Sequence, residues 1–226
     1  VLQIVNRVQG EAEVRRTIDD ARGMGFTSVG VDFIYGLPLQ TLDSLRTTMD
    51  VIAQHMPDRI SFYPYAHVPW IKPSQRRYTE ADLPEGEDKR ALYLAGRAHL
   101  DQLGYVEIGI DQFARRGDAL ARAAAEGHLH RNFMDYTAVP TRALIGLGVS
   151  AIGDGWTALA QNEKSQQRWE MRVTAGELPL QRGHVLDDED RRLRTHIHSL
   201  LTRYGTQWAP DEHDAPWRAP IVARLA

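Results

Sequence analysis

The feature that most constrains this chain is the apolar run from Ser28 to Pro38, which has a single acid, Asp32, near its middle. Apolar residues without alternation are typical of a strand covered by helices on both faces, as in a parallel sheet. Gly36 and Pro38 end the run, so we expect Asp32 near the carboxyl edge of the strand, where α/β folds bind ligands. A buried carboxylate is costly unless something binds it. The alternative is that Asp32 caps its own loop or the next helix.

The segments around this strand follow an α/β pattern. Apolar residues at helical spacing predict a helix that ends at Met24-Gly25 and a second helix from Leu42 to Met56, with Thr41 as its N-cap. Arg59–Tyr63 predicts another strand. Helix, strand, helix and strand with short connections indicate parallel pairing, as in a βα barrel or an open α/β sheet.

The rest of the chain is less regular. Pro64 to Pro84 is rich in proline, and such long irregular segments are usually functional or partly mobile. The glycine-interrupted run from Leu144 to Gly153 predicts a strand or loop that a ligand can approach closely. Further elements are expected as helices at 91–104, 119–126 and 187–204 and a strand at 105–110, with a helical, charged chain from Asn162 onward.

Composition excludes several classes of function. The net charge of −3 indicates no general attraction to nucleic acid or a membrane surface, and no run is long enough to span a membrane. The first residues do not resemble a signal peptide, so a cytoplasmic location is expected. The chain has no cysteine. It therefore holds no disulfide, cysteine nucleophile, thiolate zinc site or cysteine-bound iron–sulfur cluster.

The densest polar cluster is Gly127–Phe133. His128 and His130 would lie on one face of a strand, but no third ligand stands at a companion spacing, so we predict no metal site. Two interpretations stay open for Arg115, Arg116, His130 and Arg131: contacts to an anionic ligand, or a solvated charged surface. His196 and His198 fall in the last predicted helix, where they point apart and are expected to be solvated.

No nucleophile–base set, Walker loop or hydrolase elbow is present. From its residues alone, the chain is part of an α/β fold with a ligand site around Asp32 and the segment from Gly146 to Gly153.

Several stretches, in order along most of the chain, resemble the oxygen-independent coproporphyrinogen III oxidases of the radical S-adenosylmethionine superfamily. The most specific is the His130-Arg131-Asn132-Phe133 stretch, which resembles the oxidase branch rather than the related haem-chaperone branch. The others are Val5–Arg7, Gly25–Ser28, Asp32–Pro38 with Gln40-Thr41, Tyr65–Pro69, Ala81–Pro84, Phe113–Arg115, Tyr136-Thr137, Gly146–Ile152 and Ala160–Asn162.

The resemblance implies a chemistry for the complete protein in haem biosynthesis. That family decarboxylates two propionates of coproporphyrinogen III to vinyls, giving protoporphyrinogen IX. A [4Fe–4S] cluster cleaves S-adenosylmethionine to an adenosyl radical, and an electron acceptor is also required. By resemblance, Arg7 and Asp32 contact one S-adenosylmethionine, and Ala66 and Ile152 contact a second. Arg115, His130 and Arg131 are expected to bind the substrate propionates.

The resemblance also predicts how the chain is divided. Residues 1–110 are expected to form the second half of a partial βα barrel with parallel strands. Residues 111–226 are expected to form a mixed, then mainly helical region that covers the substrate and is cut short at its end. The cluster-binding loop would precede Val1, so the chain is expected to be an inactive fragment, and monomeric. The alternatives are a haem- or porphyrin-binding chaperone without oxidase activity and an unrelated α/β small-molecule binder.

Overall fold

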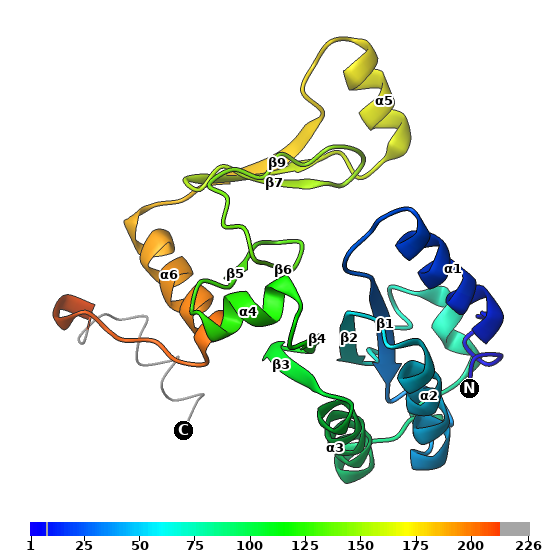
Figure 1. Ribbon diagram of the computed structural model, residues 1–226. Coiled ribbons are helices and arrows are strands. Elements are labelled where there is room, and N and C mark those ends of the chain that lie inside the picture. The colour runs from blue at the N-terminus through cyan, green and yellow to red at the C-terminus, as the bar shows by residue number, and fades with distance from the viewer. Residues whose placement is uncertain (8, 213–226) are drawn as a thin grey trace. The chain divides into compact units, whose positions relative to one another are not determined.

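The computed structural model describes residues 1–7 and 9–212, which form two compact units (Figure 1). The first unit is Val1–Glu126, and the second begins at Gly127. The end of the predicted 111–226 region, from 213 onward, lies outside the described residues.

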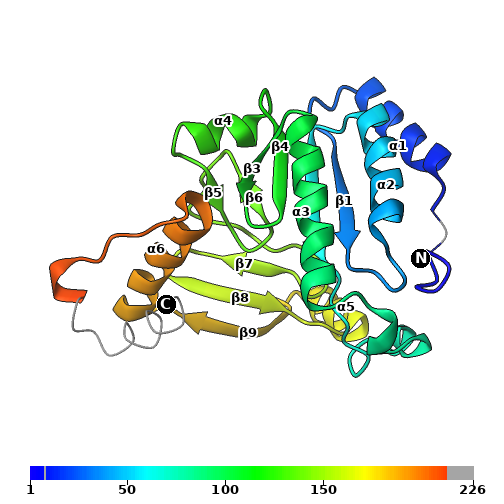
Figure 2. The ribbon, with the colours of Figure 1, turned by 90° about the horizontal axis from the view of Figure 1, so that it is seen from below.

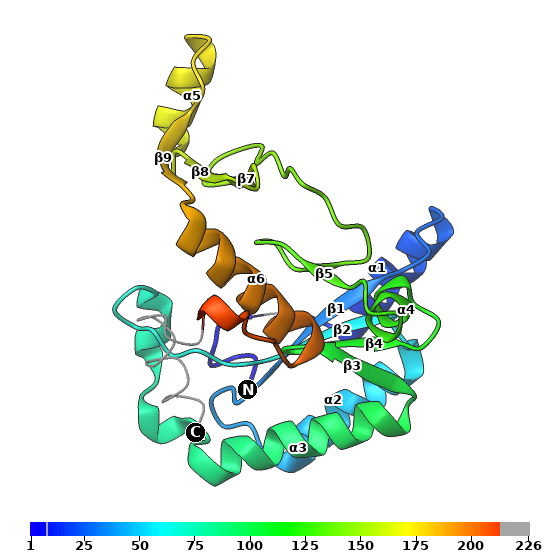
Figure 3. The ribbon, with the colours of Figure 1, turned by 90° about the vertical axis from the view of Figure 1, so that its left-hand side faces the viewer.

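The first unit is a four-stranded sheet with the strand order β1-β2-β4-β3. Helices α2 and α3 lie together on one side of this sheet (Figure 3). Its elements are α1 (Glu11–Gly23), β1 (Gly30–Tyr35), α2 (Leu42–His55), β2 (Arg59–Pro64), two 3-10 turns (Pro73–Arg77 and Glu80–Asp82), α3 (Gly86–Gln102), β3 (Tyr105–Gly109), β4 (Gln112–Arg115) and α4 (Ala119–Ala125).

The sheet is mixed, which corrects the expectation of parallel strands. Only β1 and β2 run parallel, while β4 is antiparallel to both β2 and β3. The chain reverses between β3 and β4 at Ile110-Asp111, with Asp111 in the left-handed region at φ 60°. So short a link can join only antiparallel strands, because a parallel crossover needs a dozen or more residues. The described residues form no closed barrel.

Helix α2 begins where the sequence predicts. The Thr41 hydroxyl accepts from the Ser44 N–H at 3.2 Å, and the Ser44 hydroxyl accepts from the Thr41 N–H at 2.9 Å. This reciprocal pair satisfies two of the donors that every helix start leaves open. The predicted N-cap is therefore confirmed, and the helix buries Leu45, Met49 and Ile52.

One face of the sheet carries the hydrophobic core, and we call it the core face. Phe33 of β1 stacks on Phe62 of β2 with ring centroids 5.2 Å apart, and Phe113 of β4 meets Phe62 edge-on. Offset and edge-on pairs of this kind add to the free energy of burial. Leu45 and Met49 of α2 complete the same cluster.

The second unit combines a two-stranded ribbon with a three-stranded sheet (Figure 2). The ribbon pairs β5 (His130–Arg131) with β6 (Tyr136–Thr137). The sheet has the order β7-β8-β9. Its strands are β7 (Ile152–Asp154), β8 (Ala158–Asn162) and β9 (Leu180–Val185), and its helices are α5 (Gln166–Thr174) and α6 (Asp188–Arg203), followed by a 3-10 turn (Pro210–Glu212).

The expectation of a helical chain from Asn162 onward is wrong for 180–185. Helix α5 ends before Gly176, which adopts φ 75°, and the chain turns back to pair β9 antiparallel with β8. No apolar–polar alternation marks this strand in the sequence, because every one of its positions is exposed and none is selected for burial.

The units divide at Glu126 rather than at the predicted boundary of 110/111. Strand β4 adds to the first sheet, and α4 contacts both β3 and β4, so 111–126 packs with the residues before it. The roles predicted for the two regions remain predictions.

Gly96 of α3 lies against the Phe62 ring, and this gives a stability test. A Cβ added there would lie 2.7 Å from Cε1 of Phe62. We expect Gly96→Ala to lower the free energy of unfolding by about 1–3 kcal/mol, as overpacked cores do. In Gly23→Ala, at the end of α1, the added Cβ meets nothing within 4 Å. That control should be neutral or stabilising by up to about 1 kcal/mol. Urea unfolding measures both, and equal effects would contradict the close packing.

Candidate functional site

A set of side chains from β1 and β2 lies opposite the core face, and we call this the site face. The parallel register pairs Asp32 with Ser61, and Ile34 with Tyr63. Side chains alternate between the two faces of a strand, so these four lie on the face opposite the stacked rings of Phe33 and Phe62. Tyr63 lies next to the carboxyl end of β2, the edge at which α/β folds bind ligands.

The prediction that β1 is buried on both faces is wrong. Phe33 and Tyr35 are buried and Asp32 is exposed, so burial alternates along the strand. The reason is that α2 and α3 build the core on one face only. The carboxylate of Asp32 therefore carries no cost of burial in this unit, and it is accessible to a ligand.

The capping alternative for Asp32 fails on the loop that follows β1. The Oε1 atom of Gln40 accepts from the N–H groups of Gly36 at 2.6 Å and Leu37 at 3.2 Å. Thr41 caps the next helix. Gly36 adopts φ 79°, and a Cβ there would lie 3.0 Å from Cε of Lys89, so this turn requires glycine. Asp32 fills neither capping role.

Arg7, Asp32 and Tyr63 share one electrostatic environment. The pKa of Tyr63 is raised, first by burial of its hydroxyl and then by the negative charge of Asp32, while Arg7 opposes the shift. The charges of two predicted cofactor contacts, Arg7 and Asp32, thus both act on Tyr63, a residue that the sequence analysis did not single out. The sequence did offer one sign of Tyr63: it ends the strand predicted at Arg59–Tyr63, which follows the strand of Asp32 along the chain.

The segment after β2, which holds Ala66, is fixed by side chains from outside it. The amide of Gln75 donates to the Ala66 carbonyl at 3.1 Å and accepts from the Val68 N–H at 2.6 Å. Lys89 Nζ donates to the Tyr65 carbonyl at 2.9 Å. The Nδ1 atom of His67 is buried and has no hydrogen-bond partner among the described residues. The backbone of this segment is therefore held by hydrogen bonds from side chains, and it carries one buried polar atom without a partner among the described residues.

Ile152 opens β7 in the second unit, beside the glycine-rich run. A Cβ at Gly146 would lie 2.7 Å from the carbonyl carbon of Ile152, so this glycine serves a close approach of the chain to itself. Asn162 is buried and donates to the carbonyls of Gly146 at 3.0 Å and Gly148 at 2.9 Å. The sequence predicted that a ligand approaches the backbone at these glycines. At Gly146 the space beside the backbone is taken by the chain's own Ile152, and a ligand contact in this segment stays a prediction.

His130 and Arg131 lie on β5, which packs on α6. His130 Nδ1 is 2.8 Å from Nε2 of His198, and the Arg131 guanidinium lies 5.2 Å from the centroid of the Tyr136 ring. The Nε atom of Arg131 is buried without a hydrogen-bond partner in the described part of the chain. Tyr136 in turn donates its hydroxyl to the Leu201 carbonyl at 2.8 Å.

The expectation that His196 and His198 are solvated is wrong. His196 is buried and lies within hydrogen-bond distance of Thr206, at 2.8 Å, and Glu212, at 3.1 Å. His198 is half-buried against His130. The two rings do point apart, as their spacing predicts. Each of these two histidines, however, meets another segment of the same unit, and the helical spacing of the sequence does not reveal such contacts.

Arg115 lies apart from the site face. Its guanidinium pairs with Asp58 at 3.9 Å, and its N–H donates to the Asp58 carbonyl at 3.0 Å, next to the amino end of β2. Asp58 also receives the Val29 N–H at 3.0 Å and pairs with Arg22 at 3.6 Å. Arg115 is therefore engaged in a polar network beside the amino ends of β1 and β2. Tyr63 lies near the opposite end of β2.

The predicted site residues thus fall into two groups. Arg7, Asp32 and Ala66 belong to the first unit. Asp32 lies in the middle of β1, opposite Ser61, rather than at the carboxyl edge that the sequence predicted, and Ala66 follows the carboxyl end of β2. Ile152, His130 and Arg131 belong to the second. That one ligand is bound by both groups stays a prediction.

Known proteins resemble the chain over its whole length. No family model matches it. A protein from Escherichia coli named oxygen-independent coproporphyrinogen III oxidase is 41% identical over 100% of this chain and 50% of its own length. One of the same name from Synechocystis is 40% identical over 90% of this chain and 44% of its own.

A solved structure agrees with these relatives. It is that of coproporphyrinogen III oxidase (HemN) from Escherichia coli, described as a radical SAM enzyme. It superposes with a TM-score of 0.89 at 39% identity, over 100% of this chain and 53% of that one. The chain is homologous to oxygen-independent coproporphyrinogen III oxidase. It spans about half the length of the oxidases it matches, and it contains no cysteine. Among the described residues, no helix of this oxidase homologue is long and apolar enough to cross a membrane.

The pKa of Tyr63 gives a direct test of the site face. Asp32→Asn removes a negative charge that disfavours tyrosinate, so the pKa of Tyr63 should fall toward its ordinary value. Arg7→Gln removes a positive charge and should raise it further. Ultraviolet titration of tyrosinate, with Tyr63→Phe to assign the signal, measures both. Asp43→Asn, at an exposed position of α2, should leave the pKa of Tyr63 unchanged. No response of that pKa to Asp32→Asn would refute the grouping.

Proposed function

We propose that this chain supplies part of an oxygen-independent coproporphyrinogen III oxidase of haem biosynthesis. In this role it contributes contacts to S-adenosylmethionine and to the porphyrinogen. The observation that carries the proposal is the 0.89 TM-score at 39% identity to the Escherichia coli enzyme over the whole chain. In the proposed reaction, two propionates of coproporphyrinogen III would be converted to vinyls with loss of carbon dioxide. S-adenosylmethionine would supply the radical that removes a hydrogen atom from each, and an electron acceptor that these residues do not supply would take the remaining electron.

The residues of this chain do not fit an iron–sulfur cluster. Such clusters are held by cysteine thiolates, and the sequence has none. We therefore assign no part of the cluster chemistry to these residues. In the complete enzyme the cluster ligands would have to come from outside these 226 residues.

The residues on the site face and after β2 do fit S-adenosylmethionine. An exposed carboxylate such as Asp32 accepts hydrogen bonds from the two hydroxyls of a ribose. Arg7 lies in the same environment. Ala66 in the first unit and Ile152 in the second each stay a predicted contact to a second S-adenosylmethionine.

The contacts to substrate would come from β5. Coproporphyrinogen carries several carboxylates, which must be paired when they leave water. The buried, unpartnered Nε of Arg131 fits a propionate, because a guanidinium binds a carboxylate through two parallel hydrogen bonds. His130 lies beside it. We leave Arg115 out of this contact, because Asp58 already engages it.

The contact of Asp32 with the cofactor can be measured by binding. In the complete enzyme, Asp32→Asn should weaken S-adenosylmethionine binding about 10- to 100-fold, the range for a lost hydrogen bond to a charged group. Isothermal titration calorimetry measures the dissociation constant, with Asp43→Asn as the control. Unchanged affinity would remove Asp32 from the site. Tight haem binding without porphyrinogen turnover would favour the chaperone alternative instead.

The contact of Arg131 with a propionate can be measured by kinetics. Arg131→Gln should raise KM for coproporphyrinogen III about tenfold or more, because one charge-assisted pair is lost. KM for S-adenosylmethionine should stay the same. Arg115→Gln is the matched control and should leave both constants unchanged. Equal effects of the two substitutions would contradict the assignment.

A further inference from the structure

His198 forms a histidine pair with His130 across the second unit. It comes from α6, its Nε2 lies 2.8 Å from Nδ1 of His130, and the two ring centroids are 4.5 Å apart. The residues are 68 positions apart in the sequence, so only the packing of α6 on β5 joins them. His198 belongs to none of the predicted contacts.

A second hydrogen bond decides which ring donates. The backbone N–H of Arg131 also points at Nε2 of His198, at 3.4 Å. A backbone N–H only donates, so this hydrogen bond forms only when Nε2 of His198 is an acceptor without a hydrogen. The hydrogen between the two rings therefore sits on Nδ1 of His130. A neutral imidazole carries one N–H, so Nε2 of His130 holds a lone pair.

The surroundings keep both rings neutral. Burial lowers the pKa of each ring, and the positive charge of Arg194 lowers both further. Arg203 acts on His198 in the same direction, and so does the partner ring His130. Asp154 opposes the shift at His130, but Arg194 neutralises it in a two-point ion pair with one bond at 3.0 Å.

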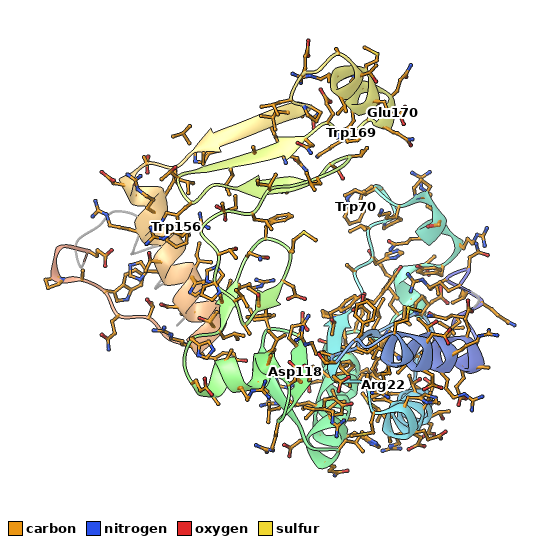
Figure 4. The ribbon with its side chains drawn as sticks, turned by 45° about the horizontal axis from the view of Figure 1, so that its top comes forward. Arg22, Trp70, Asp118, Trp156, Trp169 and Glu170 are labelled. Atoms are coloured by element: carbon orange, nitrogen blue, oxygen red, sulfur yellow. The ribbon has the colours of Figure 1, made fainter. Side chains whose placement is uncertain are left out.

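The same ion pair anchors α6 to β7. Asp154 accepts the Trp156 N–H at 2.9 Å, and the Arg194 guanidinium lies 4.6 Å from the centroid of the Trp156 ring. Trp156 lies against α6 in Figure 4. The helix that carries His198 is thus held at a second point.

We propose that His198 is a positioning residue that fixes His130 as the Nδ1–H tautomer, so that Nε2 of His130 accepts a hydrogen bond from a pyrrole N–H of the porphyrinogen. This rests on the proposed function. A porphyrinogen carries N–H donors at its centre and carboxylates at its edge. The lone pair on Nε2 of His130 accepts a hydrogen bond from a pyrrole N–H and repels a carboxylate. His130 therefore contacts the pyrrole nitrogens, and Arg131 contacts the propionates.

Nuclear magnetic resonance of the imidazole nitrogens tests the tautomer in the chain itself, without any activity. Long-range proton–nitrogen spectra, with His130→Gln to assign the ring, should show His130 protonated at Nδ1 and bare at Nε2 at neutral pH. His198→Phe should abolish that preference. His196→Gln is the matched control, because it alters the same helix away from β5, and should preserve it. A ring protonated at Nε2, or charged, would overturn the proposal.

Kinetics of the complete enzyme test the substrate contact. His198→Phe should raise KM for coproporphyrinogen III about five- to tenfold, the value of one neutral hydrogen bond, and leave KM for S-adenosylmethionine unchanged. An unchanged KM for the porphyrinogen would overturn the contact. If the unsubstituted enzyme does not turn over porphyrinogen, the proposed function fails, and the ring spectra then judge the tautomer alone.

Discussion

The stacking of Phe33 on Phe62 across the parallel pair β1–β2 is the contact on which the first unit depends. With α2 and α3 packed over these rings, one face of the sheet is committed to the core. Strands alternate strictly, so burying Phe33 places Asp32 on the opposite face together with Tyr63. A slip of one residue would bury the carboxylate and expose the rings, so the packing fixes the register and with it the site.

In the second unit α6 has the corresponding role. One of its sides meets Thr206 and Glu212 through His196, and another meets β5 through His198. The ion pair between Arg194 and Asp154 ties the helix to β7. Polar groups that are hydrogen-bonded in this way fix geometry more than they add stability. A short strand of two residues, β5, thus gains a defined orientation that its own ladder does not provide.

In the function we propose, the two units contact different ligands. The first offers a carboxylate and an ordered backbone to a nucleoside, and the second offers a guanidinium and an imidazole to a porphyrinogen. The oxidases that resemble the chain are about twice its length, and the cluster has no ligand in this sequence. In the function we propose, the chain therefore binds and orients, while the redox centre comes from elsewhere in the complete enzyme.

The sequence by itself determined the strands at β1 and β2, the cap of α2 at Thr41 and the likeness to the oxidases. These depend on local spacing, on a side chain that bonds a backbone three residues on, and on order along the chain. The tertiary structure alone decided that β1 is covered on one face, that β4 and β3 run antiparallel, and that His198 meets His130. These depend on contacts between residues that are distant in the sequence. Such contacts cannot be recognised from the spacing of neighbouring residues, because local structure forms without them.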